Sequence, residues 1–356
     1  MSTEKRNADI ELIRSLSLAF GPSGCEDEVR ELIKKELSST KAELFEDRMG
    51  NLYAHIRLGN GGKRLMVSSH MDEVGFMVSR ICDDGYIKVD TVGGIDASVL
   101  SGRRVTLGNE EKRALGLISS KAVHHKDADE RKKAVPIDKL YIDIGASSKE
   151  EAEAFVDIGD FGVFDSEFVL FGDRRVKSKA LDDRMGCAAM IEVIRSLCAD
   201  APGIDLDLYF CFTVREEIGL SGAEVAANRL LPDFAIVLET TAVGDIADTP
   251  DASRVAFLGK GGVISLMDRS TIYDRGLVDF LLATAQESEI KAQIKKYVSG
   301  GNDAGHIHKS GKGVKCAALS VPTRYLHSAS CVASLDDYEA LRDLTDAEIR
   351  NFERIM

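Results

Sequence analysis

The chain has 356 residues, of which 44% are hydrophobic and 29% are charged. This composition is typical of a folded globular protein with a large core and is too apolar for a disordered chain. The 46 basic residues against 59 acidic residues give a formal net charge of -13 without a long basic run, which argues against nucleic acid as a partner. No stretch approaches the roughly 20 apolar residues of a membrane span, so we expect no membrane partner either.

The amino-terminal segment and the cysteines indicate the compartment. Met1 to Asn7 is polar and lacks the long apolar core of a signal peptide. The seven cysteines form an odd set without a C-x-x-C pair, unlike a disulfide framework or a structural zinc site. We therefore expect a cytoplasmic protein whose cysteines are reduced.

The first part of the chain predicts two helices and then two strands. A helical stripe of apolar residues ends before Gly21-Pro22, and a second stripe begins at Val29. The strand expected over residues 63–69 is apolar, as a central strand buried on both faces would be. We expect helices over residues 10–18 and from residue 29 onward, and strands over residues 51–58 and 63–69.

From Gly75 to Gly162 the chain changes to short β-like runs separated by Asp-Gly, Gly-Gly and Gly-Asn turn signals, which predicts an inserted β domain. Alternation of helix and strand returns after Phe168. Such alternation predicts an α/β fold, with a mostly parallel sheet and helices on both faces. The expected elements are a helix over 184–197, strands over 206–213 and 234–238, a helix from residue 221, and further segments at 277–288, at 316–321 and from 335 onward.

Polar residues of metal-ligand type follow the predicted strands, where ligand sites of such sheets form. His70 and Asp72 stand two apart after the strand over 63–69, so their side chains point to the same side of an extended chain. A carboxylate close to a histidine commonly holds its second ring nitrogen when the first binds a metal. A surface strand end is the alternative interpretation of this pair.

Two pairs of adjacent acids come later in the chain. Asp182 and Asp183 precede the helix expected from Arg184, and a helix cap with an acidic first turn is the alternative interpretation there. Glu216 and Glu217 follow a strongly apolar strand. Because neighbouring side chains diverge, one of these carboxylates can bind a metal while the other faces the substrate; the alternative is a solvated strand end.

Glu239 follows the buried strand over 234–238, and His327 follows another strand-like run, where a lone histidine is more often a surface or core residue. With His70, Asp182 and Glu217, these residues make a set of two histidines and three carboxylates. Two divalent ions about 3.5–4 Å apart, held by such a set, hydrolyse amide or phosphate bonds. Zinc or cobalt suits nitrogen and oxygen ligands better than magnesium does.

The motifs of the chain, in order, are Pro22-Ser23-Gly24-Cys25-Glu26, His70-Met71-Asp72-Glu73-Val74-Gly75, Val92-Gly93-Gly94, Ala180-Leu181-Asp182-Asp183-Arg184, Glu216-Glu217-Ile218-Gly219, Gly301-Asn302-Asp303-Ala304 and Arg324-Tyr325-Leu326-His327-Ser328. In this order they resemble the TET, or glutamyl, aminopeptidase family of two-metal metallo-aminopeptidases, which is also labelled endoglucanase M-like. The resemblance covers nearly the whole chain.

The resemblance implies that the chain binds two divalent metal ions per subunit, zinc or cobalt, and cleaves the first residue from peptide substrates. In the family pattern Asp182 would bridge both ions. His70 and Glu239 would complete one site, and Glu217 and His327 would complete the other.

The resemblance also implies roles for two further acids. Glu216 would be the general base, taking a proton from the metal-bridging water and later delivering it to the leaving amine. Asp72 would orient His70. Many relatives carry Asp at the position of Glu239, a departure that keeps the type of donor atom.

For the fold, the resemblance implies a three-layer α/β/α phosphorylase/hydrolase-like catalytic domain over residues 1–74 and 163–356. An inserted PDZ-like β-barrel over residues 75–162 would serve dimerisation. Dimers of such relatives often assemble further into tetrahedral dodecamers, so the resemblance implies a homo-oligomer.

Three other functions stay open at this stage. A two-metal carboxypeptidase or deacylase of the same fold could use the same ligands, and a non-catalytic scaffold could keep the fold without the metals. An endoglucanase needs two carboxylates facing each other across a sugar, for which the adjacent Glu216 and Glu217 are a poor pair, and the chain has no Trp for sugar stacking.

Overall fold

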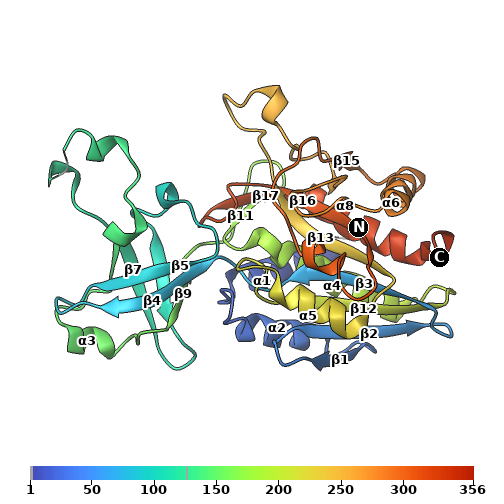
Figure 1. Ribbon diagram of the computed structural model, residues 1–356, viewed down its shortest axis with the longest axis horizontal. Coiled ribbons are helices and arrows are strands. Elements are labelled where there is room, and N and C mark those ends of the chain that lie inside the picture. The colour runs from blue at the N-terminus through green and yellow to red at the C-terminus, as the bar shows by residue number, and fades with distance from the viewer. Residues whose placement is uncertain (1–2, 126) are drawn as a thin grey trace.

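The computed structural model describes residues 3–125 and 127–356. Met1 and Ser2, which belong to the polar amino-terminal segment discussed above, lie outside the described residues. The chain forms a large α/β unit with a smaller β-barrel beside it (Figure 1). In the sequence, the barrel strands lie between β3 and β10 of the large sheet.

The large sheet runs in the order β1-β2-β12-β3-β13-β16-β17-β11-β10, with β14 joined to β16 and β15 joined to β14. Its strands are β1 Glu43–Glu46, β2 Leu52–Leu58, β3 Lys63–His70, β10 Val169–Phe171, β11 Arg175–Ser178, β12 Leu206–Thr213, β13 Phe234–Ala242, β14 Gly262–Ile264, β15 Ala292–Ile294, β16 Lys315–Arg324 and β17 Cys331–Ser334. β3 pairs in parallel with β12 and β13, and β13 pairs in parallel with β16. The carboxyl ends of these four strands therefore meet at one edge of the sheet.

Helices cover both faces of this sheet, which gives the three-layer α/β/α arrangement. α4 packs on β3 and β13 and contacts α1, α2 and α8, whereas α5 packs on β12 and contacts α7. Strands covered on both faces bury both sets of side chains, and Val67, Phe210 and Ile236 are fully buried. The helices are α1 Thr3–Leu18, α2 Asp27–Leu37, α3 Lys149–Glu153, α4 Leu181–Ala199, α5 Ser221–Leu230, α6 Arg275–Glu287, α7 Ala304–Ile307 and α8 Leu335–Arg350, and the short 3-10 helices are η1 Ala97–Val99, η2 Val123–His125, η3 Glu130–Lys132, η4 Ile137–Lys139, η5 Asp251–Ser253 and η6 Phe352–Arg354.

The smaller unit is a closed antiparallel barrel with the strand order β4-β5-β8-β7-β6-β9. Its strands are β4 Gly75–Ile81, β5 Ile87–Val92, β6 Arg104–Gly108, β7 Arg113–Ser119, β8 Tyr141–Asp143 and β9 Phe161–Phe164. The barrel has a hydrophobic core separate from that of the large unit, in which the rings of Phe76 and Phe164 pack edge to face with centroids 5.3 Å apart. Closure pairs every strand with two neighbours and leaves no free sheet edge.

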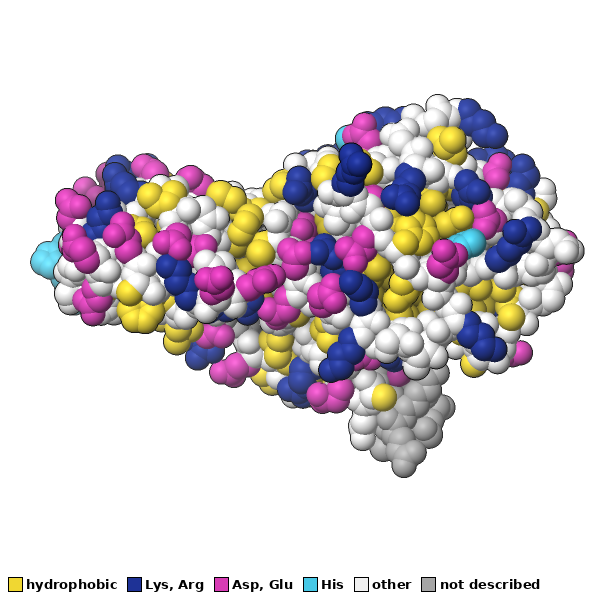
Figure 2. All heavy atoms as spheres, turned by 90° about the horizontal axis from the view of Figure 1, so that it is seen from below, with side chains coloured by type: hydrophobic (Ala, Val, Ile, Leu, Met, Phe, Trp, Pro, Cys, Tyr) yellow, Lys and Arg dark blue, Asp and Glu magenta, His cyan; other side chains and the backbone are white. Residues whose placement is uncertain are grey.

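The fold class predicted from the sequence is confirmed, and most expected elements are present. The expected helix over 184–197 lies within α4, in which Asp182 and Asp183 have non-helical backbone angles, and the expected strand over 234–238 continues to Ala242. Within the described residues no helix is both long and apolar enough to cross a membrane. On the face shown in Figure 2, acidic and basic side chains are interspersed over both units, with apolar patches between them.

Candidate metal centre

The ligand-type side chains predicted from the sequence meet at the edge where the parallel strands end. His70 is the last residue of β3, Glu239 lies in β13, Glu217 follows β12, His327 follows β16, and Asp182 lies at the start of α4. They form two groups that share Asp182, one with His70 and Glu239 and one with Glu217 and His327. Within each group the candidate ligand atoms all lie within 4.8 Å of one another.

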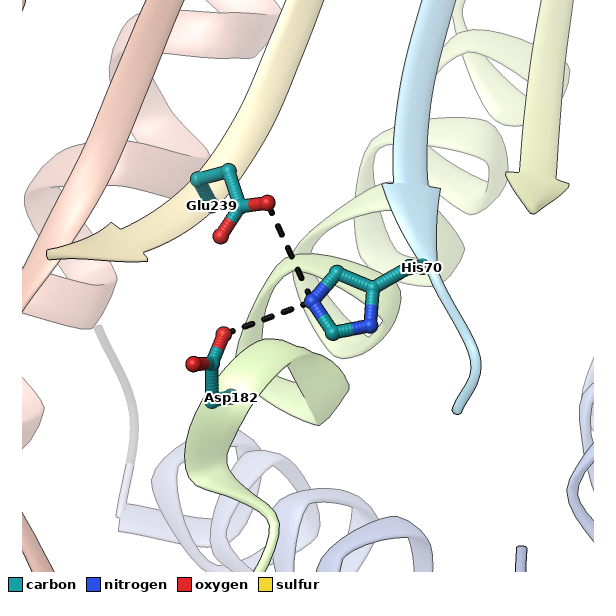
Figure 3. A group of neighbouring side chains, drawn as sticks. All are labelled: His70, Asp182 and Glu239. Carbon is teal, nitrogen blue, oxygen red and sulfur yellow. Dashed lines mark ion pairs between the residues drawn. The ribbon is translucent and has the colours of Figure 1, made fainter. Parts of the chain in front are cut away.

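The two oxygens of Asp182 face different groups. Nε2 of His70 lies 3.4 Å from Oδ1 of Asp182 and 3.8 Å from Oε1 of Glu239 (Figure 3). Nε2 of His327 lies 3.4 Å from Oδ2 of Asp182 and 3.2 Å from Oε1 of Glu217. Asp182 therefore has the geometry of a carboxylate shared between two cation sites.

Each histidine is oriented through its other ring nitrogen. Nδ1 of His70 lies 3.1 Å from the backbone oxygen of Asp72, and Nδ1 of His327 lies 2.7 Å from the backbone oxygen of Gly94. A carbonyl oxygen can only accept, so Nδ1 carries the hydrogen in the neutral ring. The lone pair of Nε2 then points toward the carboxylates, which is the tautomer that a metal ligand requires.

The carboxylates of the cluster favour positive charge beside them. Burial lowers the pKa of His327, but the carboxylates of Asp182 and Glu217 outweigh burial and raise this pKa to about 11. Burial also lowers the pKa of His70, but the carboxylates of Asp182 and Asp72 outweigh burial, and this pKa lies well above its usual value. Burial also raises the pKa of Glu239 well above its usual value. A divalent cation beside these carboxylates would satisfy the same demand for positive charge.

The residues present fit a divalent metal. Oδ1 of Asp182 is buried and has no hydrogen-bond partner among the described residues. Such an orphaned acceptor costs about 1–3 kcal/mol unless another group meets it. The donor set of imidazole nitrogens and carboxylate oxygens is suited to zinc and related transition metals.

The neighbouring acid, Asp183, has a different role. Its Oδ1 accepts the N–H of Gly186 at 3.1 Å, and its Oδ2 accepts the hydroxyl of Ser69 at 2.5 Å. Asp183 therefore satisfies an amide in the first turn of α4, as a capping residue does. The sequence left a choice between cap and ligand for this pair; the structure places Asp183 as a cap, and it places Asp182 in both candidate ligand groups.

Asp72 and Glu216 lie next to the cluster. Asp72 is fully buried, and its carboxylate accepts the N–H groups of Glu216 at 3.0 Å and Glu217 at 3.1 Å. Its Oδ1 lies 3.5 Å from Nδ1 of His70. Glu216 lines the same cavity as the ligand-type residues, and burial raises the pKa of its carboxyl well above the usual value.

The cavity beside the cluster has a volume of about 420 Å³. Sequence reasoning did not assign Asp268 or Lys295 to it, although both line its wall. Asp303 was quoted only as part of a motif, yet it is buried behind the site and accepts the hydroxyl of Thr213 at 2.6 Å. The Gly300-Gly301 pair at the start of this motif was a usable signal, because glycine often marks backbone that approaches a ligand closely.

Comparisons with known proteins identify the family of the chain. The sequence profile of the M42 glutamyl aminopeptidase family matches residues 50–344. The chain is 32% identical to the lysyl aminopeptidase of Pyrococcus furiosus, over 93% of this chain and 94% of that one. The crystal structure of a TET aminopeptidase from a marine sediment archaeon of the Thaumarchaeota superimposes with a TM-score of 0.93 at 36% identity, covering 97% of each chain. The TET1 peptidase of Pyrococcus horikoshii, described as able to assemble into a tetrahedron or a large octahedral shell, superimposes with a TM-score of 0.84 at 36% identity, covering 95% of this chain and 98% of that one.

Fold and site together define a peptidase of the metal-dependent aminopeptidase class. The chain belongs to the M42 glutamyl aminopeptidase family.

Proposed function

We propose that the chain releases amino-terminal residues from peptides with two divalent ions per subunit, zinc or cobalt, held by His70, Asp182, Glu217, Glu239 and His327. The observation that carries the proposal is the sharing of Asp182 between two groups of donors at the wall of one cavity. Metal ions bound there would supply Lewis-acid polarisation of the scissile carbonyl and a water activated at neutral pH.

Glu216 is the general base of the proposed reaction. Its carboxylate accepts a proton from the attacking water and later delivers that proton to the leaving amine. Two features support this role. Glu216 lines the cavity that holds the ligand-type residues, and its neighbour Glu217 takes part in the cluster. Asp72 orients His70 and holds the backbone of Glu216.

The cavity also supports a restriction to substrates with a free amino terminus. Its wall carries several carboxylates, among them Glu216, Glu239 and Asp268. A protonated amine is attracted to such a wall, whereas a blocked amine loses this interaction and adds bulk. A substrate that enters with its amino group first therefore offers its first peptide bond to Glu216.

Lys295 supports a preference for an acidic first residue. It is the one lysine or arginine among the described residues that line the cavity, and its Nζ donates to the backbone oxygen of Ser299 at 2.8 Å. A charge-assisted hydrogen bond to a substrate carboxylate is worth about 1.5–3 kcal/mol. We predict that Lys295→Met lowers kcat/KM for glutamyl anilide by roughly 10-fold to 100-fold relative to leucyl anilide. An unchanged ratio between the two substrates would contradict the assignment.

The alternative function is a two-metal carboxypeptidase or deacylase. One experiment distinguishes it from the proposed aminopeptidase. Chelator-treated protein is given zinc or cobalt and assayed on peptides with free amino termini, on their N-acetylated counterparts and on peptides with amidated carboxyl ends. The proposal expects metal-dependent release of single amino-terminal residues from free-amine peptides, amidated or not. Cleavage confined to acylated peptides or to free carboxyl ends would favour the alternative, and no cleavage by metal-loaded protein would favour a non-catalytic scaffold.

We also propose the domain division and the assembly. The catalytic domain comprises residues 1–74 and 163–356, and the barrel over residues 75–162 is a dimerisation domain. Leu115 and Leu117 on the outer side of β7 are 60% and 49% exposed, which supports a contact between copies through the barrel. In the proposed assembly, dimers are the building block of a tetrahedral dodecamer in the cytoplasm, and the Pyrococcus horikoshii relative that can assemble into a tetrahedron supports it. Light scattering coupled to size exclusion tests the assembly, since one chain weighs 38.7 kDa.

A further inference from the structure

The segment that carries Glu216 is held by side chains from elsewhere in the chain. β12 ends at Thr213, so the amide groups that follow have no strand partner and need other acceptors. Four successive N–H groups each meet a side-chain oxygen: Val214 donates to Oδ1 of Asn51 at 3.1 Å, Arg215 to Oε1 of Glu26 at 3.2 Å, Glu216 to Oδ1 of Asp72 at 3.0 Å, and Glu217 to Oδ2 of Asp72 at 3.1 Å. The backbone next to the general base is therefore fixed by acceptors that are distant in the sequence.

Arg215 has an unfavourable backbone conformation in this segment. Its φ is 56°, in the left-handed region that residues other than glycine rarely adopt. Such a conformation costs about 1–2 kcal/mol and persists where surrounding contacts hold it. The hydrogen bond from the Arg215 amide to Glu26 is the contact that meets this residue's backbone directly.

Glu26 is itself firmly placed. Its side chain is buried at 5% exposure, and Oε1 also accepts the N–H of Gly24 at 2.7 Å. The loop before it is joined to the segment after β3, because Ser23 donates its hydroxyl to Oδ2 of Asp72 at 2.5 Å and its amide to the backbone oxygen of Glu73 at 3.2 Å. Ser23 thus connects the loop that carries Glu26 to Asp72, and both acids accept amides of the segment that carries Glu216.

We propose that Glu26 is a positioning residue for the general base, acting through the amide of Arg215. The inference rests on the proposed function, in which Glu216 moves the proton. Loss of the acceptor lets Arg215 relax from its left-handed conformation and displaces the Glu216 carboxylate. Most of the cavity wall belongs to other segments, among them those of Glu239, Asp268 and Lys295, so substrate binding is affected less than turnover.

The hydrogen bond to the Arg215 amide requires the length of the Glu26 side chain and not its charge. Burial, followed by the nearby charge of Asp72, raises the pKa of Glu26 to about 7, so its neutral form is populated at neutral pH. Oε1 can accept both amides in either form. Gln keeps the length and the oxygen, whereas Asp keeps the charge but is one methylene too short to reach Arg215.

The test compares Glu26→Gln with Glu26→Asp in the metal-loaded enzyme, with Glu28→Asp as the matched control. Glu28 lies in the same segment, but its carboxylate accepts hydrogen bonds from the amide of Phe20 and from the guanidinium of Arg113. We expect Glu26→Asp to lower kcat between about 10-fold and about 100-fold with KM within about threefold, since small misplacements have effects of this size. Glu26→Gln and Glu28→Asp should keep kcat within about threefold of the parent enzyme.

Hydrogen exchange of residues 212–218 in the same proteins gives a readout independent of turnover. Exchange there should be faster in Glu26→Asp and unchanged in Glu26→Gln. Parent-like kcat in Glu26→Asp, an equal loss in Glu26→Gln, or loss of the folded structure in Glu26→Asp would each overturn the positioning role. A Glu216→Gln arm in the same assay keeps the two proposals apart, because full activity of that variant would instead overturn the role of Glu216.

Discussion

Buried carboxylates cost folding free energy unless something compensates them, and the candidate site concentrates them. Burial raises the pKa of Glu216 and of Glu239 well above the usual value. At these positions function offers a reason for the cost, because a cation can neutralise the cluster. Glu348 on α8 offers a contrast: it is fully buried, outside the site, and neither of its carboxylate oxygens has a hydrogen-bond partner among the described residues.

We predict that Glu348→Gln stabilises the protein at alkaline pH. Burial raises the pKa of Glu348 well above its usual value, so the folded state retains a proton that the unfolded state releases above its pKa of 4.5. The stability that this retained proton confers is therefore fully present below pH 4.5 and is lost as the pH rises through the folded pKa. The glutamine variant does not titrate. Its advantage should grow with pH, by about 1.4 kcal/mol for each unit of pKa difference.

Urea unfolding at pH 4.5 and at pH 8 measures this difference, with the exposed Glu353→Gln as the control. A stability difference that stays constant between the two pH values would contradict the assignment. Activity should be unaffected in either variant, because Glu348 does not line the cavity.

Single residues also show what the sequence could and could not predict. The meeting of His70, Glu217 and Glu239 was predictable because strand ends of a parallel sheet meet at one edge. Asp182 and His327 each had another interpretation in the sequence, and the family resemblance was needed to include them. Glu26 and Lys295 were not predictable. Their roles depend on how the loop before α2 and the segment after β15 pack against distant parts of the chain, and no local pattern encodes such contacts.

At the scale of elements, the barrel contributes directly to the candidate metal centre. The loop after β5 places the backbone oxygen of Gly94 2.7 Å from Nδ1 of His327. Gly93 has a φ of 82°, and a Cβ there would lie 2.9 Å from Cγ1 of Val74 and 3.3 Å from Cβ of Glu217. The close approach of this loop to the site therefore requires glycine at position 93.

We predict that Gly93→Ala weakens metal binding while Gly94→Ala does not. The alanine at position 93 is strained by its positive φ and by Val74, so the loop shifts and His327 loses its orienting carbonyl. Loss of such a partner lowers metal affinity by roughly 10-fold to 100-fold. A Cβ at Gly94 would meet only Nδ1 of His327, at an ordinary contact distance of 3.7 Å, which makes it the matched control. Equal metal affinities of the two variants in competition titrations with a chelator would count against this role of the loop.

The elements themselves differ in how well the sequence predicted them. β3, β12, β13 and β16 were predicted because strands buried on both faces read as continuous apolar runs. β14 and β15 were missed, because three residues are too few for any alternation to be recognised. β1 was missed as well, since its four residues are partly exposed and include two glutamates.

At the scale of the whole molecule, the proposed ions join segments that are far apart in the sequence. Their ligands range from position 70 to position 327 and come from several strands and one helix. Ligands that bind only the folded state raise its stability with concentration. We predict that chelation lowers the thermal midpoint and that zinc restores it, by about 2.7 kcal/mol of stability at a free concentration 100 times the dissociation constant. His327→Ala should reduce the shift, and a midpoint indifferent to chelator and zinc would argue against folded-state metal sites.

The most direct test of the account is a paired measurement on Glu216→Gln and the parent enzyme, comparing metal content per chain with the rate of hydrolysis of a free-amine peptide. The account predicts two divalent ions per chain in both proteins, and a fall in kcat between about 100-fold and about 10,000-fold in the variant alone. A variant that turns over at the parent rate, or a parent enzyme that is fully active without bound metal, would contradict it.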